Sequence, residues 1–310
     1  MPASQSFLKQ QNLSDSLKRI AIVLVCVIQG SATHNVIKKN LLREGFFKII
    51  PWSQKAFSPD AMKELKCIEP KLEDYRELIL SCAEIFEDDL SRKIYSNVMT
   101  ACILRKFDGL TFIDSEEQYF PLDIEMTKGY RSFMDCGAFC GDTLENLVKK
   151  NLTPKIYIAF EPDWRNFLKI TQLIEKFNID KALLFPCALS RNTMPLRFTL
   201  DQVHSGAGSS IDPNGEYLVQ CVAIDECLKG IEPTFIKIDI EGNEIEALIG
   251  AKKTIVHYRP DIAVAIYHYA DHYFKIPNLL HRWNLGYRFH IRTYDYFGNE
   301  TILYATCPSH

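Results

Sequence analysis

The spacing of apolar residues changes abruptly within one short stretch of the chain. Residues 236–241 alternate isoleucine with Lys237, Asp239 and Glu241, which is the period of a strand with two unlike faces. From residue 243 onward the apolar residues stand three and four apart, which is the period of a helix. The pattern therefore predicts a strand that ends in charged groups and passes directly into a helix.

The same change of period recurs along the C-terminal two thirds of the chain. Short apolar runs at 131–137, 155–161, 182–190, 234–241 and 261–268 alternate with helical patterns at 142–150, 163–177, 243–255 and 271–284. This alternation predicts a mostly parallel sheet with helices on both faces, interrupted by shorter strands over 191–230. The last two apolar runs are joined by a short Gly-Asn turn, so we expect an antiparallel C-terminal hairpin.

Residues 1–115 lack this alternation of strand and helix patterns. We predict that they form a smaller N-terminal region, α/β or helical, of uncertain role. Their apolar run at 20–28 follows two cations, as in a signal peptide, but its β-branched residues favour a buried strand. The run is too short to span a bilayer. We therefore predict a cytoplasmic protein without a membrane span, divided into residues 1–115 and a domain at 116–310.

Charge and cysteine content narrow the classes of function. The 310 residues carry a formal net charge of −3 and no long basic stretch, so we expect no nucleic-acid partner. The 10 cysteines include no CxxC pair, which is typical of a reducing compartment and not of a disulfide framework.

The first strand of the alternation ends in the stretch FMDCGAFCGDT, residues 133–143. Its glycines, Gly137 and Gly141, form GxxxG, which differs from the GxGxxG of dinucleotide-binding proteins. Gly137 permits a sharp turn and a close approach of backbone to ligand, and Asp142 or Thr143 is expected to cap the next helix. The free N–H groups at that helix start would suit a small carboxylate.

Acidic residues flank this turn on two successive strands. Asp135 precedes the first glycine, where it would attract an ammonium or another cationic centre, and Glu161 follows the next strand, where it would accept ribose hydroxyls. Together they predict a site for S-adenosylmethionine. The predicted cofactor-binding residues are Asp135, Gly137, Ala138, Phe139, Gly141, Asp142, Thr143, Glu161, Pro162, Ala188 and Leu189.

These motifs together resemble the FkbM-type methyltransferases. The resemblance rests on residues 133–143, 159–163, 235–251 and 262–268, and it extends over about 115–306. It implies a class I methyltransferase fold, which is a Rossmann-like sheet of seven strands with one antiparallel strand. It also implies O-methylation, often of sugars or glycosylated natural products.

The charged strand end supplies the catalytic candidates. Lys237, Asp239 and Glu241 share one face of the strand, and we expect Lys237 to pair with Asp239 or with a carboxylate on a neighbouring strand. A hydroxyl acceptor must lose its proton during methyl transfer, and Asp239, Glu241 and His268 are the candidate bases.

Two further acids follow this strand end in the sequence. Asn243 and Glu246 resemble a capping box for the following helix, so Glu244 and Glu246 are assigned to solvent and capping. They are therefore left out of the predicted catalytic set.

A metal site is not predicted from the sequence. His268 and His272 stand four apart, but no Glu follows the first His as in HExxH. A divalent ion on Asp239 and Glu241 is left open.

The favoured hypothesis is an S-adenosylmethionine-dependent O-methyltransferase with a small-molecule or glycan acceptor. The alternatives are a nicotinamide-dependent dehydrogenase and a non-catalytic cofactor-binding scaffold. The sequence sets neither the acceptor nor the oligomeric state.

Overall fold

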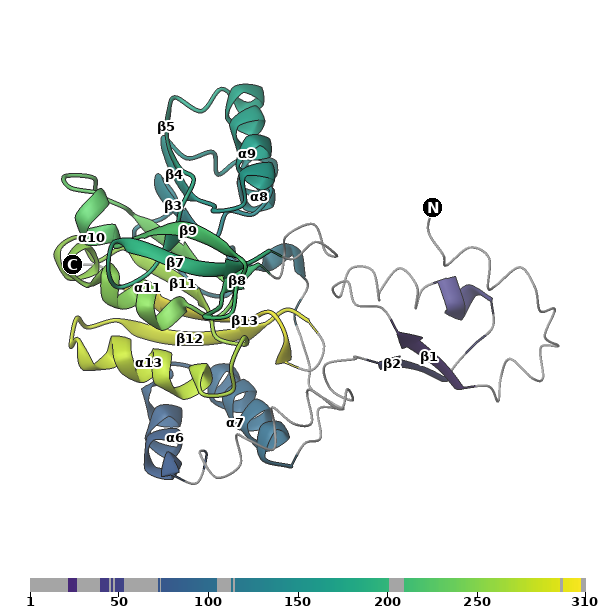
Figure 1. Cartoon of the computed structure of the whole chain (residues 1–310). Helices are drawn as coiled ribbons and strands as arrows, with labels where there is room; N and C mark the ends of the chain where they lie inside the picture. The colour runs from purple at the N-terminus through teal and green to yellow at the C-terminus, as the bar shows by residue number, and fades with distance from the viewer. Residues whose placement is uncertain are drawn as a thin grey trace.

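A seven-stranded sheet organises the structure, which is a computed structural model (Figure 1). The structure describes residues 22–26, 40–44, 46, 48–52, 72, 74–104, 113, 115–200, 209–295 and 298–307. The strands of the large sheet are β3 (Ser132–Cys136), β4 (Ile156–Phe160), β5 (Lys181–Phe185), β10 (Phe235–Ile238), β11 (Asp261–Ala265), β12 (Arg288–Thr293) and β13 (Thr301–Thr306).

The strand order is β12-β13-β11-β10-β3-β4-β5. The strands from β5 to β11 pair in parallel, whereas β13 is antiparallel to both β11 and β12. The prediction of a mostly parallel sheet with an antiparallel C-terminal hairpin is therefore confirmed. The chain runs from β3 to β4 and β5 on one side and returns to β10 on the other. This reversal creates a crevice at the carboxyl ends of β3 and β10.

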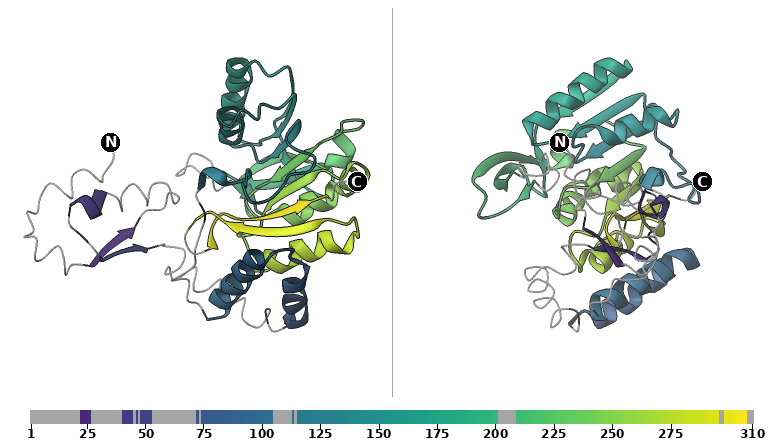
Figure 2. Two further views of the ribbon diagram at one scale, coloured as in Figure 1. Left: turned by 180° about the vertical axis from the view of Figure 1, so that it is seen from behind. Right: turned by 90° about the vertical axis from the view of Figure 1, so that its right-hand side faces the viewer.

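Helices cover both faces of the sheet. They are α6 (Arg76–Cys82), α7 (Asp89–Leu104), α8 (Asp142–Lys149), α9 (Trp164–Phe177), α10 (Ile224–Cys227), α11 (Glu244–Gly250), α12 (Lys252–Tyr258) and α13 (His272–Arg282). Figure 2 shows α6 and α7 on the opposite side of the sheet from α8 and α9. Two short 3-10 turns lie at Ala83–Ile85 and Ser115–Glu117.

The core consists of two apolar clusters, one on each face of the sheet. Met134 and Ile236 belong to the first cluster, and their strand neighbours Phe133 and Phe235 belong to the second. Because side chains alternate along a strand, a central strand covered on both faces must be apolar at nearly every position. The core strands therefore read as continuous apolar runs in the sequence.

A second, four-stranded sheet fills the interruption predicted over 191–230. Its strands are β6 (Ala188–Leu189), β7 (Met194–Thr199), β8 (Ser210–Ile211) and β9 (Tyr217–Val222), in the order β6-β9-β7-β8. The strand β6 belongs to this small sheet, so the apolar run at 182–190 is divided between two sheets.

The N-terminal region contributes a parallel pair of strands, β1 (Ile22–Cys26) and β2 (Lys48–Trp52). The apolar run at 20–28 thus contains a strand, as expected. Helices α6 and α7 pack on α13 and β12, and Cys82 and Tyr95 lie in the same cluster as Met134. The boundary after residue 115 stays a prediction about how the chain is divided.

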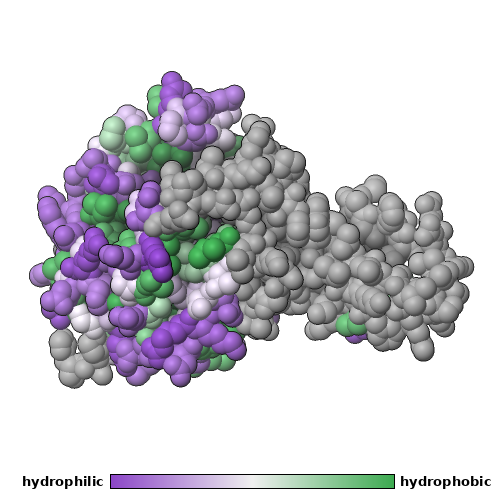
Figure 3. All heavy atoms as spheres, turned by 90° about the horizontal axis from the view of Figure 1, so that it is seen from below, coloured by the Kyte–Doolittle hydropathy of each residue, from purple (hydrophilic) through white to green (hydrophobic). Residues whose placement is uncertain are grey.

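The outer surface near α6 and α7 is largely polar. Figure 3 views the molecule from this side, where apolar residues are scattered among polar ones. Leu80, Leu90 and Ile103 are among the exposed apolar residues of these two helices. Such scattered exposure is ordinary for a protein surface. Among the described helices, none is both long and apolar enough to cross a bilayer.

Candidate functional site

A cavity of about 360 Å³ opens at the carboxyl ends of the central strands. Its size falls within the roughly 300–1,000 Å³ of small-molecule sites. The predicted residues that line it are Gly137, Phe139, Asp142, Thr143, Glu161, Pro162, Ala188, Leu189, Asp239 and Glu241. The predicted residues Asp135, Ala138, Gly141 and His268 are not part of the lining.

A buried ion pair joins the two strands on either side of the crevice. Asp135 and Lys237 are register partners across β3 and β10, and the Lys237 ammonium lies 3.0 Å from Asp135 Oδ1. The Tyr157 hydroxyl donates to Asp135 Oδ2 at 2.7 Å, and Lys237 donates to the Gly137 carbonyl at 2.6 Å. Lys237 therefore pairs with a carboxylate on a neighbouring strand, one of the two predicted partners.

The electrostatics of this pair keep Lys237 charged. Burial alone would lower the pKa of Lys237, but the Asp135 and Asp239 carboxylates raise it above its usual value. Asp135 is fully buried beneath the turn that follows β3. Its carboxylate therefore supports the wall of the cavity, and a direct contact between Asp135 and a ligand stays a prediction.

The turn after β3 requires glycine at two positions. Gly137 has φ +81°, and a Cβ there would lie 1.8 Å from the Asp239 carbonyl oxygen. Gly141 has φ +86° and occupies the N-cap position of α8, where no side chain caps the helix. The expectation that Asp142 or Thr143 caps α8 is therefore wrong, because the left-handed glycine starts the helix one residue earlier.

Glu161 occupies the end of β4 with both carboxylate oxygens in use. Oε2 accepts from the Phe139 N–H and Oε1 from the Asp163 N–H, each at 2.8 Å. Burial raises the pKa of Glu161 to about 7, although these two hydrogen bonds act to lower it. The side chain therefore lines the cavity as a carboxyl group whose raised pKa makes its charge sensitive to pH around neutrality.

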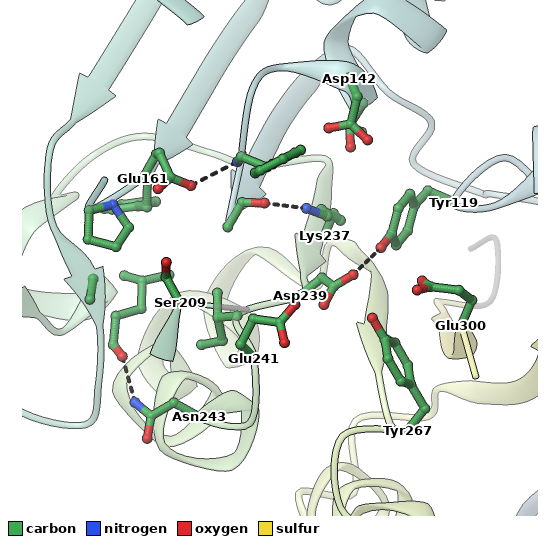
Figure 4. Close-up of a pocket in the computed structure, with 18 of the residues that line it drawn as sticks. Tyr119, Asp142, Glu161, Ser209, Lys237, Asp239, Glu241, Asn243, Tyr267 and Glu300 are labelled. Atoms are coloured by element: carbon green, nitrogen blue, oxygen red, sulfur yellow. Dashed lines mark hydrogen bonds between the residues drawn. The ribbon is translucent and has the colours of Figure 1, made fainter. Parts of the chain in front are cut away.

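The second half of the cavity contains the acids at the end of β10 (Figure 4). Asp239 Oδ2 accepts a hydrogen bond of 2.6 Å from the Tyr119 hydroxyl. His268 Nε2 lies 3.5 Å from Asp239 and 3.5 Å from Glu241. The three predicted catalytic residues are thus brought together, with the two carboxylates lining the cavity and the imidazole behind them.

Glu244 is buried, whereas the sequence assigned it to solvent and helix capping. Its carboxylate is fully buried and accepts from the backbone N–H groups of Ile240 and Gly242 at 3.1 Å each. Glu246 pairs with Arg191, and the N-terminus of α11 carries no side-chain cap. The capping-box assignment is therefore wrong, because the turn folds back and buries Glu244 beneath it.

Three residues that line the cavity at the end away from Glu161 escaped the sequence prediction. Figure 4 shows Tyr119, Tyr267 and Glu300 on the side of Asp239 that faces away from Glu161. Glu300 accepts a 2.7 Å hydrogen bond from Gln118, and its pKa is raised to about 7 by burial and then by the Asp239 charge. Glu300 reaches the site from the connection between β12 and β13, and no local pattern marked it.

Strained backbone concentrates at this cavity. Tyr119, Phe139, Glu241 and Glu300 have φ values of 66°, 47°, 58° and 53°, a region that side chains rarely adopt. The other described non-glycine residues with positive φ follow helices and are Asn151, Asn178, Arg259 and Asn284. Strain of this kind persists where surrounding structure enforces it, commonly at functional sites.

A model of the FkbM methyltransferase domain matches residues 135–289, which is half of the 310-residue chain. The chain belongs to the FkbM methyltransferase family. The matched segment contains the glycine turn, Glu161 and the acids at the end of β10. None of the curated proteins matches the chain in sequence.

The chain also aligns with several solved structures. The FkbM methyltransferase from Methylobacillus flagellatus KT aligns with a TM-score of 0.66 and 17% identity, over 91% of this chain and 73% of that one. An rRNA methylase from Streptococcus thermophilus has a TM-score of 0.35 and 10% identity, over 59% of this chain and 92% of that one. The SAH-bound methyltransferase PaMTH1 from Podospora anserina has a TM-score of 0.34 and 9% identity, over 82% of this chain and 97% of that one. The first of these likenesses supports the class I methyltransferase fold.

The close approach at the glycine turn predicts a large loss of stability in Gly137→Ala. Gly230→Ala is a matched control, because Gly230 has φ +76° and a Cβ there meets nothing within 4 Å. Both variants carry the left-handed backbone cost of about 1–2 kcal/mol. We expect urea denaturation to show a further loss of about 2–3 kcal/mol in Gly137→Ala. Equal losses would mean that the contact with Asp239 is easily relieved.

Proposed function

We propose that the protein is an S-adenosylmethionine-dependent O-methyltransferase that methylates a hydroxyl group of a sugar, a glycan or a glycosylated metabolite. One observation carries this proposal. A single cavity joins a glycine turn with an adjacent buried carboxylate, Glu161, to a pair of acids, Asp239 and Glu241. Membership of a methyltransferase family supports the same activity.

The cofactor half of the cavity fits an adenosine that carries an amino acid. Glu161 uses one lone pair of each oxygen for backbone N–H groups, and an ionised carboxylate has about four such acceptor positions. Two positions are therefore left for ribose hydroxyls. The first N–H groups of α8 have no side-chain cap and lie beside the lining residues Asp142 and Thr143, so they suit a small carboxylate.

The acid pair suits the removal of a proton from an acceptor hydroxyl. When bound, S-adenosylmethionine supplies an electrophilic methyl group, which the acceptor oxygen takes as the carbon–sulfur bond breaks and its electron pair stays on sulfur. Asp239 and Glu241 line the cavity, and one of them receives the proton that this oxygen loses. His268 lies behind both carboxylates, and we assign it to positioning them.

The acceptor half offers groups that recognise hydroxyls. The Tyr119 and Tyr267 side chains and the Glu300 carboxylate line this half. They provide aromatic surface together with hydrogen-bond acceptors, which fits a compact polar acceptor with several hydroxyl groups. This composition supports a sugar over a purely apolar acceptor.

Calorimetry with S-adenosylhomocysteine tests the cofactor assignment. We expect wild-type protein to bind in the micromolar range and Glu161→Ala to bind at least tenfold more weakly, because a ribose contact of about 1.4 kcal/mol or more is lost. Glu175→Ala is the matched control, since Glu175 is an exposed glutamate on α9. Absence of heat with the wild type would favour the dehydrogenase or scaffold alternative.

The raised pKa of Glu161 predicts a pH-dependent affinity. Because the carboxylate predominates only above a pKa of about 7, tight binding should be present at pH 8 and lost as pH falls. If the ionised form alone accepts the ribose, affinity for S-adenosylhomocysteine at pH 6 should be about tenfold lower than at pH 8. Glu161→Gln should show a flat profile over this interval. A wild-type profile as flat as that of the variant would contradict the ribose role.

A further inference from the structure

His268 presents one buried ring nitrogen, Nε2, to two carboxylates at the same distance. Its side chain is 6% exposed, and Nε2 lies 3.5 Å from both Asp239 Oδ1 and Glu241 Oε2. His268 Nε2 and Asp239 Oδ1 have no hydrogen-bond partner among the described residues. Buried polar atoms are normally paired, so Nε2 and Asp239 Oδ1, which lie 3.5 Å apart without a hydrogen bond, call for a bound group.

We propose that Asp239, Glu241 and His268 bind a divalent metal ion at the edge of the cavity. Their ligand atoms all lie within 4.8 Å of one another. Around an ion with bonds of about 2.1 Å, adjacent ligands stand about 3 Å apart and opposite ligands about 4 Å. The separations of 3.5 Å on either side of His268 Nε2 therefore suit adjacent ligands after a small adjustment.

Residues outside this triad orient its ligand atoms. Glu244 Oε1 lies 3.0 Å from His268 Nδ1, which favours a proton on Nδ1 and leaves the Nε2 lone pair for the ion. The other Glu244 oxygen lies 3.3 Å from His272, which shares the acid from the far side. The Tyr119 hydroxyl occupies Asp239 Oδ2, so Oδ1 is left to bind the ion. Carboxylate–histidine pairs of this kind support protein metal sites.

The charge around the triad favours a cation. Glu300 lines the same cavity, and Glu244 is fully buried behind it. Lys237 also lines the cavity, but its ammonium is already paired with Asp135. The cluster thus holds more acidic groups than its own cations neutralise, and a divalent ion would relieve this repulsion. Carboxylates suit Mn²⁺ and imidazole suits ions such as Zn²⁺ and Fe²⁺, so the set fits a divalent transition-metal ion, for which Mn²⁺ is the probe.

The chemical role of the ion rests on the proposed function. Three protein ligands leave coordination positions open toward the cavity, where the acceptor hydroxyl would bind and its pKa would fall. Its proton would then pass to the second oxygen of Glu241, whose side chain is 35% exposed. Each carboxylate would hold the ion through one oxygen, and the remaining oxygen of Glu241 would complete the proton transfer proposed above.

Titration with Mn²⁺ alone tests the site without any turnover. Free Mn²⁺ is measured by its electron paramagnetic resonance signal as protein is added. We expect one Mn²⁺ per wild-type chain, and at least tenfold weaker binding in His268→Gln and in Glu241→Gln. His281→Gln, an exposed histidine at the end of α13, is the matched control and should bind as the wild type does.

Circular dichroism and S-adenosylhomocysteine binding accompany each variant and separate the metal site from the proposed function. If His268→Gln fails to fold, the part-exposed Glu241 still provides the test. Wild-type protein that leaves Mn²⁺ free at millimolar concentration would overturn the site, as would a folded Glu241→Gln that binds Mn²⁺ like the wild type. Mn²⁺ binding without S-adenosylhomocysteine binding would uphold the metal site and contradict the methyltransferase proposal.

Discussion

The ion pair between Asp135 and Lys237 is the constraint on which the rest of the site depends. It links β3 and β10 at the point where the strand order reverses, and both partners are almost completely buried. Removal of one partner from such a pair costs about 3–5 kcal/mol, because the other charge is left without compensation. The same ammonium donates to the Gly137 carbonyl, so the pair also fixes the turn that follows β3. This turn also places Gly137 directly against the backbone of Asp239.

This arrangement separates two chemical environments within one cavity. Glu161 lies on one side and is held by backbone N–H groups, whereas Asp239 lies on the other and is held by the Tyr119 hydroxyl. Between them the backbone adopts positive φ at Phe139 and Glu241, which turns both side chains toward the cavity. Residues with strained backbone conformations therefore line the cavity, as is common at functional sites.

The periodicity of the sequence predicted the sheet, its antiparallel hairpin and the strand ends that form the cavity, because side-chain burial imposes that period directly. The ion-pair partner of Lys237 could be narrowed to two candidates, since a buried ammonium needs a carboxylate. The caps of α8 and α11 were predicted wrongly because left-handed residues, Gly141 and Glu241, redirect the chain where the sequence shows only polar residues. Glu300 was missed because only tertiary packing brings it to the cavity.

A crystal structure with S-adenosylhomocysteine tests the central claim most directly. The account predicts that the ribose hydroxyls lie within hydrogen-bond distance of Glu161, that the amino-acid carboxylate lies at the start of α8, and that the sulfur points toward Asp239. A ligand bound outside this cavity, or a ribose that makes no contact with Glu161, would contradict the account.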